Sequence, residues 1–178
     1  REIKKNLNSK TDLVITSGAV SAGKFDFIPS VIKKFKLKSF FKGVLIRPGK
    51  PITFAKFNKH TSFFGLPGNP ISSAACFRFF VQPYLFFSLG VELNDKIDVR
   101  LDNSFSKKYN FTRFIKGKLF RSKNEIKFKV LPGQESFRIK SFVKSNSWGI
   151  FPNGKSLFKK NDKIKCTGLS ILGDINLN

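Results

Sequence analysis

The stretch Asp12-Leu13-Val14-Ile15-Thr16-Ser17-Gly18, with its continuation Ala19-Val20-Ser21-Ala22-Gly23-Lys24, decides the fold. Its apolar run ends in a Ser-Gly turn, which predicts a short buried strand. Residues 26–36 come next, and their apolar side chains recur with a helical period, so we expect a helix there. A strand, a glycine turn and a helix in succession are typical of an α/β layer structure.

The residues on either side extend this pattern. We expect a helix at 1–10, strands at 43–46, 52–57 and 62–65, and a buried helix at 72–89. After Gly90 the sequence changes to short alternating stretches at 111–120, 125–130 and 163–167, which are typical of half-buried antiparallel strands. We therefore predict an α/β part over residues 1–90 and a small β part over residues 91–178.

Composition bounds the class of protein. The 178 residues carry 34 Lys and Arg against 11 Asp and Glu, a formal net charge of +23. Because 40% of the residues are hydrophobic, we expect a folded body and not a disordered basic tail. The apolar runs are far shorter than the roughly 20 residues that a bilayer requires, so no membrane span is predicted. The chain contains no Met, and we expect it to be a fragment of a longer protein.

Two interpretations of the charge stay open. Lys and Arg that neutralise phosphates favour nucleic-acid binding, even without sequence specificity. The basic residues are spread from Arg1 to Lys165 without one concentrated block, which favours a solvated surface instead.

The cysteines Cys76 and Cys166 form no CxxC pair, so we expect two reduced, buried thiols in a cytoplasmic protein. With His60 as the single histidine, a zinc cluster or a Ser-His-Asp triad is not expected.

Three loops carry the candidate chemistry. The turn Gly18 to Lys24 matches G-x-x-x-x-G-K, but residue 25 is Phe where a nucleotide-binding P-loop needs Ser or Thr. It is therefore a P-loop, a turn beside another ligand or a structural turn. In Gly65 to Ser73, Asn69 can cap a helix whose first residue is Pro70. The free amides at this helix start could bind an anion, or the segment could be a helix cap and nothing more. Arg47-Pro48-Gly49-Lys50-Pro51 places two cations around a turn. The nearby carboxylate Asp26 could hold magnesium or cap a helix.

In this order and spacing, the three loops resemble the molybdopterin molybdenumtransferase family, which includes the gephyrin E domain. The likeness continues more weakly through Phe111 to Arg113 and Gln134 to Ser136. The resemblance implies an α/β fold: a three-layer molybdopterin-binding-like domain, present in part over residues 1–90, and then a small antiparallel β-barrel domain over residues 91–178.

The resemblance also implies an activity, in which molybdate is inserted into adenylylated molybdopterin with release of AMP and the help of Mg²⁺. It implies catalytic roles for Asp26, Arg47 and Lys50, with Asp26 as the metal ligand. The implied cofactor-binding residues are Ser17, Gly18, Ser21, Gly23, Pro67, Gly68, Asn69, Pro70, Ser72 and Ser136. The implied partners are a second copy of the chain, upstream domains of the same chain and the molybdopterin adenylyltransferase. Neither nucleic acid nor membrane is expected.

The sequence departs from the family pattern at several positions. Ala19 replaces the second glycine of the first loop, Gly43 stands where a lysine is common, and Arg47 replaces a lysine. Glu135 adds a negative charge where a glycine is usual. Three alternatives to an active transferase therefore remain: a P-loop nucleoside triphosphatase, a basic nucleic-acid-binding module and an inactive protein of the same fold.

Overall fold

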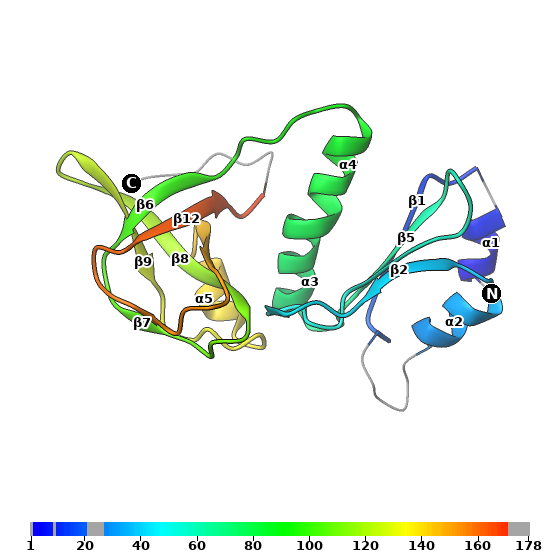
Figure 1. Cartoon of the computed structure of the whole chain (residues 1–178), viewed down its shortest axis with the longest axis horizontal. Coiled ribbons are helices and arrows are strands. Elements are labelled where there is room, and N and C mark those ends of the chain that lie inside the picture. The colour runs from blue at the N-terminus through cyan, green and yellow to red at the C-terminus, as the bar shows by residue number, and fades with distance from the viewer. Residues whose placement is uncertain (1, 9, 21–26, 171–178) are drawn as a thin grey trace.

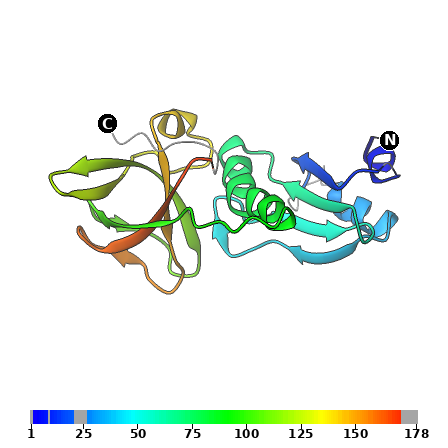
Figure 2. The ribbon, with the colours of Figure 1, turned by 90° about the horizontal axis from the view of Figure 1, so that it is seen from above.

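The computed structural model describes residues 2–8, 10–20 and 27–170. Its two parts lie end to end, with a long helix standing between a sheet and a barrel (Figures 1 and 2). Among the described residues, no helix is long and apolar enough to cross a membrane.

The first sheet contains four strands in the order β1-β5-β4-β2. β1 (Leu13–Ser17) runs parallel to β5 (Ser62–Leu66), whereas β4 (Thr53–Lys56) and β2 (Lys38–Lys42) continue the sheet in antiparallel pairs. The predicted strands at 12–16, 52–57 and 62–65 are thereby confirmed. The strand predicted at 43–46 is wrong, because Gly43 takes a positive φ of 81° and turns the chain. Residues 38–42 form the strand instead, on an edge where charged residues are tolerated.

Helices cover both faces of this sheet. On one face, α1 (Glu2–Asn8) and α2 (Ile28–Lys34) bury Leu7 and Ile28 against Phe63. On the other, α3 (Pro70–Cys76), the π-helical turn η1 (Phe77–Val81) and α4 (Gln82–Ser88) follow one another. The Gln82 amide donates to the Phe77 carbonyl within this π-turn. Pro83 has no amide to donate, so the widened turn lets the predicted helix pass it.

The second part is a closed barrel in the strand order β10-β12-β6-β9-β8, with β8 returning to β10. The strands are β6 (Ile97–Leu101), β8 (Thr112–Ser122), β9 (Glu125–Val130), β10 (Ser147–Phe151) and β12 (Lys163–Gly168). The short strands β7 (Phe105–Ser106) and β11 (Leu157–Phe158) pair outside it, and α5 (Ile139–Val143) precedes β10. A fully antiparallel barrel is the wrong prediction, because β6 and β9 run parallel. An odd number of strands cannot alternate direction all the way around.

The two parts share contacts across residue 90. β3 (Ile46–Arg47) pairs in parallel with the start of β8. Phe79, in the helix, stacks on Phe114 of the barrel with ring centroids 3.7 Å apart and planes 8° apart. The buried Arg78 donates to the carbonyl of Gly168, and also to Asp95 and Thr167. One hydrophobic core therefore joins the helix to the barrel, and it fixes the space between them.

Candidate functional site

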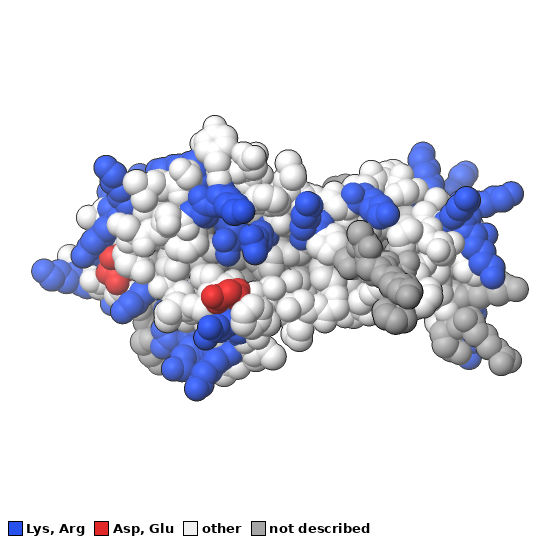
Figure 3. Space-filling view, turned by 90° about the horizontal axis from the view of Figure 1, so that it is seen from below, with Lys and Arg blue, Asp and Glu red and all other residues white. Residues whose placement is uncertain are grey.

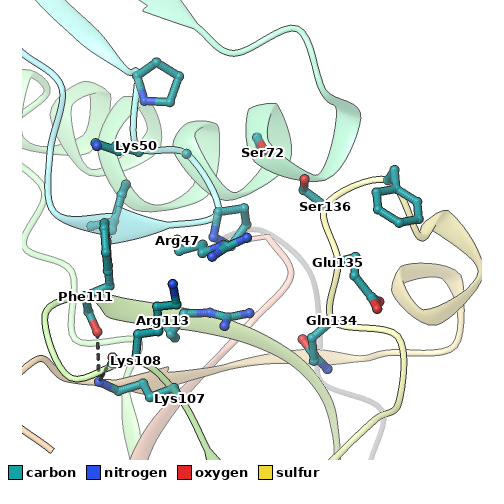
Figure 4. Close-up of a pocket in the computed structure, with 15 residues that line it drawn as sticks. Arg47, Lys50, Ser72, Lys107, Lys108, Phe111, Arg113, Gln134, Glu135 and Ser136 are labelled. Atoms are coloured by element: carbon teal, nitrogen blue, oxygen red, sulfur yellow. Dashed lines mark hydrogen bonds between the residues drawn. The ribbon is translucent and has the colours of Figure 1, made fainter. Parts of the chain in front are cut away.

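A cavity of about 680 Å³ lies where the α/β part meets the barrel. One wall is the turn after β3, together with Ser72 of α3. The other is formed by the segment that leads into β8 and by the loop after β9 (Figure 4). The lining residues are Ile46, Arg47, Pro48, Gly49, Lys50, Pro51, Ser72, Lys107, Lys108, Phe111, Arg113, Gln134, Glu135, Ser136 and Phe137. Segments far apart in the sequence thus meet at one site.

Five cations line this cavity, and their charges affect one another. Burial and then the charge of Arg47 lower the pKa of Arg113. The buried Nε of Arg113 has no hydrogen-bond partner among the described residues. Burial and then Arg113 lower the pKa of Lys107, whose ammonium donates to the Phe111 carbonyl at 2.9 Å. An anion in the cavity would offset this repulsion.

Some of these cations are accessible from outside. Figure 3 shows Lys and Arg side chains spread along this side of the molecule, with few acidic side chains among them. Lys50 and Lys108 are exposed, and the Lys50 ammonium lies 6.0 Å from the centre of the Phe111 ring. A net positive surface around a concave site favours the approach of an anion.

Both walls of the cavity also carry hydroxyl groups, and the second wall includes a carboxylate residue. Ser72 and Ser136 present their hydroxyls into the same space (Figure 4). Glu135 lines the cavity as well, but its carboxylate is turned away from Arg47 and Arg113, toward α5 (Figure 4). Its carboxylate is 3.6 Å from Nε of Arg138, outside the lining set, which partly balances it.

A second cavity of about 390 Å³ adjoins the first and shares Pro51 and Ser72 with it. It is lined by Gly18, Ala19, Val20, Pro51, Pro67, Gly68, Asn69 and Ser72. The two glycine turns lie against each other here, because a Cβ on Gly68 would lie 3.3 Å from the Gly18 Cα. An added Cβ at Gly68 would therefore crowd the other turn, whereas Gly18 favours glycine because its φ is 87°.

The helix start beside this cavity has the predicted cap. The Asn69 side chain accepts a hydrogen bond from the Ile71 amide at 3.2 Å, and Pro70 occupies the first turn of α3. Ser17 Oγ donates to the Pro67 carbonyl at 3.4 Å, which ties the first glycine turn to this loop. Ser17 and Pro70 thus support the cavity without lining it.

The structure brings most of the expected residues together. Arg47, Lys50, Ser72 and Ser136 line the larger cavity, and Gly18, Pro67, Gly68, Asn69 and Ser72 line the smaller one. Ser21, Gly23 and Asp26 lie outside the described residues. Lys107, Lys108 and Arg113 also line the site, and they were not predicted from the sequence. A pair of lysines just before a strand is a weak signal, and only the barrel's closure brings them to the α/β part.

The described residues do not form a metal site. Within residues 2–8, 10–20 and 27–170, no three His, Cys, Asp or Glu side chains gather in a way that could hold a metal ion. Glu135 alone among cations is not the oxygen-rich donor set that Mg²⁺ prefers. The described residues therefore do not fit magnesium, and the expected ligand Asp26 is outside them.

The structure also shows the conformation of Ala19 and the state of the two cysteines. Ala19 has a positive φ of 55°, so the residue that replaces the second glycine sits in a conformation that L residues disfavour. Both cysteines are free and buried, as predicted. Burial raises the pKa of the Cys76 thiol to about 12, and its Sγ donates to the Gly49 carbonyl beneath the Arg47–Pro51 turn.

Comparisons with known proteins agree with this geometry. Residues 1–86 match the family model described as "Probable molybdopterin binding domain". The molybdopterin molybdenumtransferase of Synechococcus elongatus is 32% identical over 158 residues, which cover 88% of this chain and 38% of that protein. The Bacillus subtilis enzyme of the same name is 32% identical over 152 residues, 84% of this chain and 35% of that protein. The chain thus spans less than two fifths of either relative.

Solved structures have the same fold. A molybdenum cofactor biosynthesis protein from Pyrococcus furiosus superposes with a TM-score of 0.70 at 22% identity, covering 93% of this chain and 52% of that one. A molybdopterin biosynthesis moeA protein from Pyrococcus horikoshii gives a TM-score of 0.72 at 26% identity, covering 94% of this chain and 39% of that one. The α/β part and the barrel therefore follow an arrangement seen in solved proteins.

Proposed function

Since the chain belongs to the molybdopterin molybdenumtransferase family, we propose that it is part of an enzyme that inserts molybdate into adenylylated molybdopterin and releases AMP. Two relatives that bear this name support the type of enzyme. Because those relatives are longer than this chain, we also propose that further domains precede it in the full protein. The domain boundary near residue 90 and a three-layer first domain, present in part over residues 1–90, belong to the proposal as well.

One observation carries the proposal: a cationic cavity and a glycine-lined cavity meet at Ser72 and Pro51. The first suits a compact oxoanion such as molybdate, because Arg47 and Arg113 supply charge and fixed N–H donors. The second suits a phosphate-bearing ligand, because its backbone is bare of side chains near Gly68 and the start of α3 follows. A ligand that extends through both would bring its phosphate end to the oxoanion.

The residues present explain how AMP could leave. An oxygen of molybdate or water must attack the phosphorus as the phosphoanhydride bond breaks, and negative charge then builds on the departing AMP. Arg47 and Lys50 line the first cavity, where they can offset this charge. The hydroxyls of Ser72 and Ser136 can donate to oxygens of either anion. Magnesium stays in the proposal through Asp26 alone, and no step here depends on it.

The proposed partners are a second copy of the chain and the molybdopterin adenylyltransferase that would supply the substrate. The proposed compartment is the cytoplasm. Two buried free thiols are compatible with a reducing environment.

AMP release from the longer protein, with its upstream domains restored, tests the function. Adenylylated molybdopterin and molybdate are supplied with and without Mg²⁺. Arg113→Ala should lower the rate by about 10²-fold or more, by analogy with the loss of one oxyanion donor. Lys118→Ala is the matched control, because Lys118 lies on the same strand and is exposed away from the cavity. Asp26→Ala tests the metal role.

Three results would contradict the proposal or part of it. AMP release that does not require molybdate removes the transferase reaction. ATP hydrolysis abolished by Lys24→Ala supports the P-loop alternative. Substrate binding without any AMP release by the wild-type protein indicates an inactive protein of this fold.

A further inference from the structure

Lys116 is an unusual residue of the barrel, because its charged side chain is almost completely buried. It lies in β8 with 1% of its surface exposed. Its Nζ donates to the carbonyls of Gly133, Glu135 and Arg138 at 2.8, 3.1 and 3.1 Å. Three carbonyls thus satisfy the three donors of the ammonium. A buried lysine is costly unless it is paired in this way, so a specific role is indicated.

All three carbonyls belong to one loop, residues 133–138. The loop also makes hydrogen bonds with the backbone of Lys116: Gln134 Oε1 accepts from the Lys116 amide at 3.0 Å and Nε2 donates to the Lys116 carbonyl at 2.8 Å. Ser141 Oγ adds a bond to the Gly133 carbonyl at 2.6 Å. The loop's own side chains belong to none of the described hydrophobic cores. Polar contacts, centred on Lys116, therefore determine its shape.

This loop is one wall of the cationic cavity. Its residues 134–137 line that cavity, and Ser136 faces Ser72 from it (Figure 4). The Lys116 ammonium lies behind the wall, since Lys116 is not among the lining residues. It can act on a bound anion only through the loop or through its long-range charge.

We propose that Lys116 is a positioning residue, which holds the 133–138 loop so that Ser136 is presented to the oxoanion in the cavity. This inference rests on the proposed function for its ligand, but the ordering of the loop can be measured without one. Burial, together with Arg113, lowers the pKa of Lys116, whereas Glu135 opposes that shift.

Lys116→Met in the 178-residue chain tests the inference, because Met keeps the volume and leaves the three carbonyls without their donor. Hydrogen exchange is followed at the amides of Arg138 and Ile139, which donate within the loop to the carbonyls of Glu135 and Phe137. Both should exchange about tenfold faster or more, since a charged hydrogen bond is lost. The amides of Leu119 and Val130, in β8 and β9, should not change.

Calorimetry with molybdate gives the second readout, and we expect about tenfold weaker binding by Lys116→Met. Lys118→Met removes the same charge from the same strand, so it measures the long-range electrostatic effect alone. Ser141→Ala removes a loop hydrogen bond without any change of charge, and it should speed exchange at Arg138 and Ile139 and weaken molybdate binding by a smaller factor.

The inference is overturned if Arg138 and Ile139 keep their protection in a folded Lys116→Met protein. It is also overturned if Lys118→Met weakens molybdate binding as much as Lys116→Met does. Should Lys116→Met unfold the chain, all four amides lose protection and Ser141→Ala decides. If the wild-type chain binds no molybdate, the proposed oxoanion site fails, while the exchange data still decide whether Lys116 orders the loop.

Discussion

At the scale of single residues, Gly49 shows how closely the cationic turn is packed on the helix. Its φ is 107°, and a Cβ there would lie 2.5 Å from Sγ of Cys76. Both the backbone conformation and the contact exclude a side chain. The position of Arg47 and Lys50 over the cavity therefore depends on a glycine between them.

Gly49→Ala should lower the free energy of unfolding by about 2 to 4 kcal/mol, through backbone strain and overpacking together. Urea denaturation measures this. Gly90→Ala is the matched control, because Gly90 also has a positive φ, of 72°, but nothing lies within 4 Å of its added Cβ. If Gly49→Ala lowers the free energy of unfolding no more than Gly90→Ala does, the Cys76 side chain moves aside at little cost and the predicted overpacking is wrong.

Ala19 is the residue that we expected to replace a glycine of the first loop, and its φ is 55°. The turn keeps its left-handed conformation although a Cβ has replaced a hydrogen. The cost of an L residue there is about 1 to 2 kcal/mol, which the surrounding contacts must offset. The Gly18 amide donating to the Leu66 carbonyl at 2.9 Å is one such contact.

At the scale of elements, the helix from α3 to α4 holds the two parts together. Arg78, in the π-turn, binds Asp95 of the segment before β6 and Thr167 of β12. Burial raises the pKa of Asp95, but hydrogen bonds from Arg78 and Thr167 and the charge of Arg78 lower it more, so it lies below the ordinary 3.8. The ionised carboxylate therefore stabilises the folded state.

The sign of the pH dependence follows from this direction. A lowered carboxyl pKa contributes stability that is present above pH 3.8 and is lost as the pH falls through the folded pKa below it. Asp95→Asn should cost about 2 kcal/mol at pH 6, because it leaves the buried Arg78 without a carboxylate. The difference from wild type should shrink as the pH falls below 3.8.

Chemical unfolding at several pH values between 6 and 3 measures the effect. Asp98→Asn serves as the control, because the Asp98 carboxylate pairs with Lys165 at 3.6 Å on the exposed surface. That variant should change stability by less than about 1 kcal/mol. A difference between Asp95→Asn and wild type that stays constant down to pH 3 would contradict the assigned role of Asp95.

At the scale of the whole molecule, the net charge of +23 has two possible uses, and salt separates them. Binding to a single-stranded oligonucleotide through scattered surface cations should weaken by about 10³-fold between 50 and 200 mM salt if six or more phosphates are contacted. Molybdate held by half-buried Arg113 should weaken by much less, because buried charges are screened less.

Fluorescence titrations with the oligonucleotide and calorimetry with molybdate, at both salt concentrations, compare the two. Arg113→Ala should abolish the molybdate signal and leave oligonucleotide binding nearly unchanged. Tight oligonucleotide binding that survives 200 mM salt would favour the nucleic-acid-binding alternative.

The sequence by itself determined the local elements and the loops of the site. An apolar run before a Ser-Gly turn predicted β1, alternating side chains predicted β9, and a segment rich in Ala and Phe predicted the long helix. Gly18, Gly68, Asn69 and the Arg47–Pro51 turn were found because glycine, proline and a capping side chain have local conformational meaning. The edge strand β2 was missed, because its exposed, charged residues carry no such pattern.

Only the tertiary structure decided how these pieces meet. The parallel β6–β9 pair follows from closing a barrel of five strands, a condition that no single strand contains. Lys107 and Arg113 join Arg47 and Lys50 because β3 pairs with β8 and Phe79 stacks on Phe114. Nothing in the sequence distinguishes Lys116 from a surface lysine, because its burial depends on the 133–138 loop that folds around it. Local propensity acts over a few residues, whereas a site between two parts is made by long-range contacts.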